Sequence, residues 1–134
     1  MNQLIPMPAM VTRHAGVFTL HPTTMIHVAS ADEEMLWLGE YLAERLRPAT
    51  GYLLEVLGGA ESAVGDILLT LDFSDAALGD EGYELAITPA QVELRAYRPA
   101  GMFRGIQTIR QLLPAAIEAP TLQPIEWQLP AAEI

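Results

Sequence analysis

The chain has 134 residues, no cysteine, and a formal net charge of −10 from 17 acidic and 7 basic residues. This length suits one domain spanning residues 1–134, which should bury roughly two-thirds of its unfolded surface. The missing cysteines exclude a disulfide framework and a thiolate metal site, and they leave the cellular compartment open. All the basic residues are arginine, which excludes lysine chemistry such as a Schiff base. The negative field disfavours nucleic acid, and no apolar run reaches the ~20 residues of a membrane helix.

The first third of the chain predicts two short strands and a long helix. Gly16–Leu20 and Met25–Val28 are expected as strands, separated by a turn at residues 21–22. Ser30 and Glu33 then match a Ser-x-x-Glu capping box, which starts a helical pattern. No signal peptide is expected in residues 1–10, because they lack a basic start and an apolar core.

Two apolar stripes run along this predicted helix. The first consists of large aliphatic side chains: Met35, Leu38, Leu42 and Leu46. The second consists of Trp37 and Tyr41, about a third of a turn away. Since one stripe is enough for packing on a sheet, the second predicts that the helix is covered from both sides.

Strands are expected again after this helix. Pro48 and Gly51 predict its end. Tyr52–Leu57 is predicted as a strand, and the mostly apolar Asp66–Phe73 as a strand near the centre of the sheet.

The clearest local signals lie between residues 82 and 114. Tyr83–Ile87 and Val92–Ala96 alternate apolar and polar residues, which predicts a hairpin across a short connection. The spacing then changes to three and four, which predicts a helix from Pro99 to Pro114. The prolines that follow favour extended structure, with a strand at Ile125–Leu129.

Short loops between consecutive strands predict an α+β fold with a largely antiparallel sheet and two helices packed on one face. Gly101 and Gly105 lie four residues apart on the second helix, where each glycine costs about 1 kcal/mol relative to alanine. This pair predicts the close approach of another backbone, with Arg104 and Gln107 as polar neighbours. A solvated helix face is the alternative for these polar residues. The candidate interface residues are therefore Trp37, Tyr41, Gly101, Arg104, Gly105 and Gln107.

Residues 100–114 read Ala-Gly-Met-Phe-Arg-Gly-Ile-Gln-Thr-Ile-Arg-Gln-Leu-Leu-Pro. With Glu-Gly-Tyr at 81–83, Leu-Ile-Pro-Met-Pro at 4–8, Gly16–Leu20 and Thr-Gly at 50–51, they resemble the small N-terminal domain of family 20 glycoside hydrolases, the β-N-acetylhexosaminidases. The resemblance implies that both helices lie between the sheet and a catalytic barrel. It implies a parent enzyme that removes terminal N-acetylhexosamine by the substrate-assisted route. This chain would brace the barrel and hydrolyse nothing alone.

Two alternatives to this supporting role are kept. One is a free-standing carbohydrate-binding module, and the other is the equivalent domain of another sugar hydrolase such as an α-glucuronidase. Without its barrel, the chain is expected to expose an apolar patch at Trp37 and Tyr41 and to self-associate.

Asp80 and Glu81 are the sharpest catalytic candidates. Family 20 enzymes carry adjacent Asp and Glu in a His-x-Gly-Gly-Asp-Glu motif, where Glu is the general acid and Asp orients the substrate's acetamido group. Here residues 76–78 are Ala-Ala-Leu, so the histidine is missing. We interpret the pair as loop charges, and a small hydrolase that uses them is a further hypothesis.

No metal site or other cofactor is expected. The histidines His14, His21 and His27 fall on turns and on different strand faces, whereas a metal needs at least three converging ligands. The serines lack a Gly-x-Ser-x-Gly elbow for nucleophilic catalysis.

Overall fold

The structure is a computed structural model that describes residues 12–29, 33–58, 64–71, 82–123 and 125–134. The described residues form seven strands, two α-helices and one 3-10 helix. In chain order these elements are β1 (Thr12–Thr19), β2 (Ile26–Val28), α1 (Glu33–Thr50), β3 (Val56–Gly58), β4 (Ile67–Leu71), β5 (Tyr83–Ile87), β6 (Val92–Ala96), α2 (Pro99–Leu112), η2 (Ala115–Glu118) and β7 (Gln128–Glu133). Neither described α-helix combines the length and hydrophobicity needed to cross a membrane.

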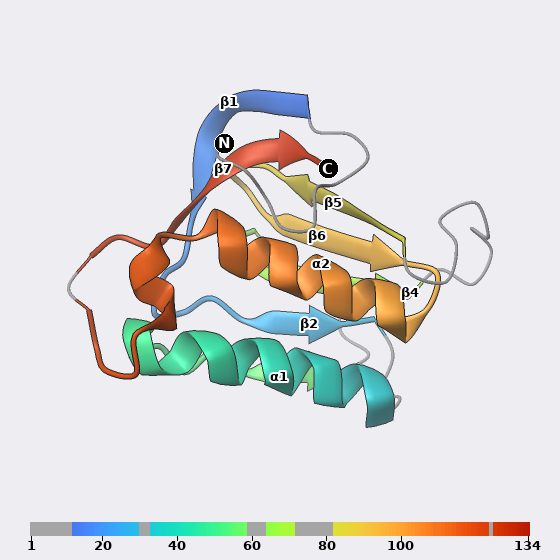
Figure 1. Cartoon of the computed structure of the whole chain (residues 1–134), viewed down its shortest axis with the longest axis horizontal. Helices are drawn as coiled ribbons and strands as arrows, with labels where there is room; N and C mark the ends of the chain where they lie inside the picture. The colour runs from blue at the N-terminus through green and yellow to red at the C-terminus, as the bar shows by residue number, and fades with distance from the viewer. Residues whose placement is uncertain (1–11, 30–32, 59–63, 72–81, 124) are drawn as a thin grey trace.

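The strands form one sheet in the order β1-β7-β5-β6-β4-β2-β3, and α1 and α2 lie side by side across one face of it (Figure 1). The α+β class is therefore confirmed, but the predicted largely antiparallel sheet is wrong in detail. The β1–β7, β5–β6 and β5–β7 pairs are antiparallel, whereas the β2–β3, β2–β4 and β4–β6 pairs are parallel. The parallel β2–β3 pair has its physical reason in α1, which carries the chain back along the sheet so that β3 starts beside β2 in the same direction.

The end of α1 agrees with the prediction at Gly51 but not at Pro48. The helix continues through Pro48 to Thr50, and Gly51 follows with φ of 71°. The Thr50 hydroxyl donates to the carbonyl of Leu46 at 2.8 Å, and the amide of Gly51 donates to the carbonyl of Arg47 at 2.8 Å. These bonds cap the last turn, and Pro48 lies within that turn, where the helix loses one amide hydrogen bond just before it ends.

Two strand predictions need correction. The strand predicted at Tyr52–Leu57 shrinks to β3, because Leu54 has φ of 47° and interrupts the extended backbone. The strand predicted at Ile125–Leu129 lies later, as β7. Pro130 is tolerated within it because it pairs with Val17, where the register of β1 is irregular.

The hairpin and the second helix are confirmed. Strands β5 and β6 pair from Tyr83 opposite Ala96 to Ile87 opposite Val92. Pro99 occupies the first turn of α2, where its missing amide hydrogen leaves no bond unmade.

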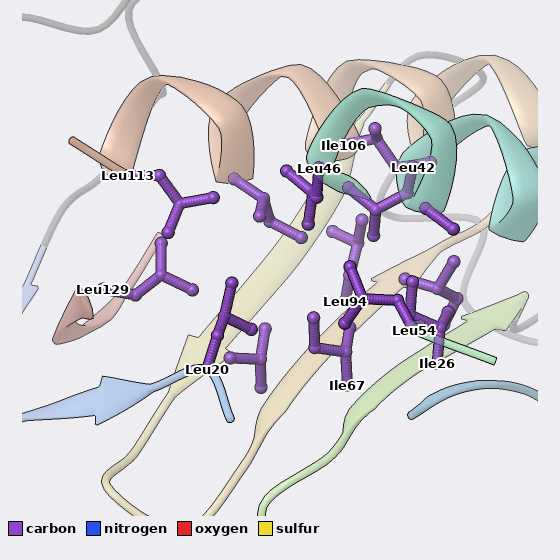
Figure 2. Close-up of a cluster of buried hydrophobic side chains, with 14 of the residues drawn as sticks. Leu20, Ile26, Leu42, Leu46, Leu54, Ile67, Leu94, Ile106, Leu113 and Leu129 are labelled. Carbon is purple, nitrogen blue, oxygen red and sulfur yellow. The ribbon is translucent and has the colours of Figure 1, made fainter. Parts of the chain in front are cut away.

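The core fills the space between the helices and the sheet. Figure 2 shows leucine and isoleucine side chains of α1 and α2 meeting those of the strands. The predicted inner stripe of α1 is confirmed, since Met35, Leu38, Leu42 and Leu46 are all buried. Among the strand residues, Ile26, Ile67 and Leu94 are completely buried beneath them.

Candidate functional site

The side of the two helices that faces away from the core carries a group of aromatic and polar side chains. We call this surface the outer helical face and define it by Trp37, Tyr41, Arg45, Phe103, Arg104, Gln107 and Arg110. Trp37 is 60% exposed and Phe103 is 38% exposed, while Tyr41 is partly buried. The second apolar stripe of α1, Trp37 and Tyr41, thus lies largely outside the packed core.

Three aromatic rings on this face form a continuous stack, which we call the aromatic ladder: Trp37, Tyr41 and Phe103. The Trp37 and Tyr41 rings stack with centroids 5.6 Å apart and an interplanar angle of 19°. The Phe103 ring meets Tyr41 at 5.1 Å with a tilt of 40°, so the ladder crosses from α1 to α2. The guanidinium carbon of Arg45 lies 4.9 Å from the centroid of the Tyr41 ring, which is cation-π distance.

A polar network holds the middle ring of the ladder. Gln107 Nε2 donates to the Tyr41 hydroxyl oxygen at 3.1 Å, and Arg110 Nη1 donates to the same oxygen at 3.2 Å. Arg110 Nη1 also donates to Gln107 Oε1 at 2.6 Å, and its guanidinium forms an ion pair with Glu118 of η2. One arginine therefore connects α1, α2 and η2.

Gly101 and Gly105 lie on the opposite side of α2 from this surface. A Cβ atom added at Gly101 would overlap the backbone carbonyl oxygen of Gly82, and one at Gly105 would overlap the side chain of Leu94. The close approach indicated by the glycine pair exists, but the neighbour is the chain's own sheet. Both glycines are buried against the sheet, so they do not belong to a surface that a second domain could contact.

Sequence reasoning selected Gln107 but missed Arg45, Phe103 and Arg110 on the outer helical face. Phe103 lies four residues before Gln107 and Arg110 three residues after it, so helical periodicity alone places them on the same side of the helix. Glu118 carries no such signal, because it lies on η2, beyond the end of α2. Arg104 was selected from the sequence, and it lies exposed beside Phe103.

The other sequence candidates do not assemble into a site. His27 is buried, and its Nε2 lies 2.8 Å from Asp66 Oδ2. His14 Nε2 is 3.8 Å from Glu133 Oε1 on the surface, and His21 is exposed. Within the described ranges, no group of three histidine or acidic residues is placed to hold a metal. Asp80, Glu81 and the capping residue Ser30 lie outside the described residues.

The fold and this surface define an α+β domain whose helical layer is covered by the sheet on one side and carries exposed aromatic rings on the other. The model of the family described as glycosyl hydrolase family 20, domain 2, matches residues 1–134. The chain belongs to this family. This assignment does not favour the carbohydrate-binding module or the α-glucuronidase alternative.

Curated relatives and solved structures agree with the assignment. The chain is 30% identical over 131 residues to a β-hexosaminidase of Porphyromonas gingivalis, which covers 98% of this chain and 16% of that protein. It is 34% identical over 112 residues to a β-N-acetylhexosaminidase of Cellulomonas fimi, covering 81% of this chain and 22% of the relative. The family 20 β-N-acetylhexosaminidase of Streptomyces coelicolor superposes with a TM-score of 0.87 at 38% identity, over 96% of this chain and 25% of its own. The Streptomyces plicatus enzyme gives a TM-score of 0.87 at 41% identity, with the same coverage of 96% and 25%.

Proposed function

We propose that residues 1–134 are one supporting domain of a longer chain, and that the outer helical face packs against the catalytic barrel of that chain. The parent chain is proposed to be a glycoside hydrolase that removes terminal N-acetylhexosamine, while this domain hydrolyses nothing alone. The names of the relatives support this parent activity. This chain spans 16% of one curated relative and 25% of the Streptomyces coelicolor enzyme, so most of their length lies outside the matching region.

The observation that carries the proposal is the exposure of Trp37. It is 60% exposed on a helix whose other side is already buried in the core. Covering an indole removes a large apolar area from water, and Trp, Tyr and Arg are the residues that contribute most to binding energy at interfaces. All three types occur together on the outer helical face.

The arrangement of the rings leaves Tyr41 unsuited to stacking against a sugar. Stacking against a sugar ring needs an open aromatic face. In the aromatic ladder, Tyr41 has Trp37, Phe103 and the Arg45 guanidinium packed around it, so its faces are already used. Trp37 is the ring of the ladder that is most exposed, so a partner contacts the ladder mainly there.

Oxidation by hydroxyl radicals, read by mass spectrometry, tests the contact directly. We expect Trp37 to be oxidised quickly in the 134-residue chain and much more slowly in the complete parent chain, because the barrel would cover it. Trp127 is 1% exposed and serves as the internal control, since its rate should be low in both proteins. Equal oxidation of Trp37 in the two proteins would overturn the proposed packing.

The same surface predicts self-association of the isolated chain, because exposed apolar patches drive association. We expect Trp37→Ser to weaken this association by about tenfold, or ~1.4 kcal/mol, in sedimentation equilibrium. Leu53→Ser is the matched control, because Leu53 is 66% exposed but lies outside the outer helical face. An isolated chain that stays monomeric at high concentration, or equal effects of both substitutions, would contradict the prediction.

A further inference from the structure

We infer that the Tyr41 hydroxyl donates a hydrogen bond to an acceptor oxygen of the covering barrel, and that Arg110 is the residue that positions this hydroxyl. The inference rests on the proposed function, since it names one contact by which the outer helical face recognises its partner. It follows from which atoms of Tyr41, Gln107 and Arg110 can donate hydrogen bonds and which can accept them.

The first step fixes the orientation of the Gln107 amide. Arg110 Nη1 lies 2.6 Å from Gln107 Oε1, and a guanidinium group can only donate hydrogen bonds. The atom facing Arg110 must therefore be the amide oxygen, because an amide nitrogen at that place would put two hydrogen-bond donors against each other with no acceptor between them. The amide nitrogen is consequently the atom that faces the Tyr41 hydroxyl at 3.1 Å.

The second step concerns the hydrogen of Tyr41. The phenol oxygen accepts from Gln107 Nε2 and from Arg110 Nη1, which uses both of its acceptor positions. Neither donor atom can accept a hydrogen bond in return. Among the hydrogen bonds within the described part of the chain, Tyr41 appears only as an acceptor. Its own hydrogen is thus available to an oxygen from outside the domain.

The third step is that this hydroxyl is held in place before any partner arrives. The side chain of Arg110 is 20% exposed, and its other donors are tied to Glu118. The ring of Tyr41 lies between Trp37 and Phe103 in the aromatic ladder. A donor that is fixed in advance loses little conformational entropy on binding, and two incoming hydrogen bonds polarise the O–H group further. The Tyr41 hydroxyl is therefore a preorganised hydrogen-bond donor that suits a carboxylate or carbonyl oxygen.

Tyr41→Phe in the parent chain tests the inference, because it removes the hydroxyl and keeps the ring. We expect Trp37 to be oxidised several-fold faster in this variant, since the barrel would be held less firmly over the ladder. Tyr83→Phe is the matched control: the Tyr83 hydroxyl is hydrogen-bonded to Thr108 of α2 inside the domain, so its loss should leave the oxidation rate of Trp37 unchanged.

The role of Arg110 is tested by non-additivity. Arg110→Met should raise the oxidation rate of Trp37 in the parent chain, and the double variant with Tyr41→Phe should raise it no further, because both act on one hydrogen bond. An unchanged rate in Tyr41→Phe, an equal increase in Tyr83→Phe, or additive effects of Arg110→Met would overturn the inference. Fast oxidation of Trp37 in the unaltered parent would instead refute the proposed packing itself.

Discussion

Gly101→Ala is expected to destabilise the domain by about 2–3 kcal/mol, the upper part of the range for overpacked sites, although alanine is the better helix former. The new Cβ would overlap the carbonyl oxygen of Gly82 and lie 3.1 Å from its carbonyl carbon and 3.3 Å from the Cβ of Ala96. A flexible side chain can move aside at little cost, but a backbone carbonyl moves only with its strand. The loss should appear as a lower midpoint of urea unfolding with an unchanged m-value.

The sign of the effect is what makes this prediction sharp. At an open helix position, replacing glycine by alanine stabilises by about 1 kcal/mol. A buried clash therefore predicts a lower urea midpoint, whereas a solvated helix face predicts a higher one. Ala100→Gly is the control on the same turn. Ala100 is exposed, so this substitution should lower the free energy of unfolding by only about 1 kcal/mol. Gly105→Ala should lose less than Gly101→Ala, since its Cβ meets the side chain of Leu94 and not backbone. A Gly101→Ala variant that unfolds later than the original chain would show that α2 does not lie against Gly82.

Local signals predicted the hairpin and the second helix closely. The alternation in β5 and β6 and the Pro99 start of α2 depend on neighbouring residues, and the structure places all three within the predicted bounds. Strand direction depends instead on which strands become neighbours. The chain order does not reveal that β2 ends up between β3 and β4, so the parallel half of the sheet was not predictable from short connections.

The outer helical face was predictable to a similar degree. Helical spacing separated Trp37 and Tyr41 from the core stripe, and the structure places both on the expected helix. The glycine pair indicated a close approach without indicating which neighbour approaches, and Gly101 and Gly105 therefore belong to the sheet contact. The ion pair between Arg110 and Glu118 depends on how η2 folds back, which no periodicity in the sequence encodes.

Asp66→Ala is expected to destabilise the domain by about 3 kcal/mol, because it leaves one buried donor and one partly buried donor without acceptors. Asp66 Oδ2 bonds His27 Nε2 at 2.8 Å, and Asp66 Oδ1 accepts the amide hydrogen of Met25 at 2.9 Å. The carboxylate thus ties the start of β4 to β2 in the parallel half of the sheet. His27 is 5% exposed and Asp66 is 8% exposed, so water cannot easily replace the lost bonds.

Asp66→Asn separates the loss of the bonds from the loss of the charge. Asparagine keeps an oxygen for the Met25 amide, but its NH2 group would face His27 Nε2, which then has to accept. The imidazole hydrogen would move to Nδ1, a buried atom without a partner in this structure, so we expect an intermediate loss of about 1–2 kcal/mol. Nitrogen chemical shifts of His27 report which tautomer is present. Glu84→Gln is the control for losing a carboxylate at the surface: it breaks an ion pair with Arg95 and should lower the free energy of unfolding by less than about 1 kcal/mol. If Asp66→Asn were as damaging as Asp66→Ala, the negative charge itself would hold β2 to β4, and the two acceptor atoms would not account for the stability.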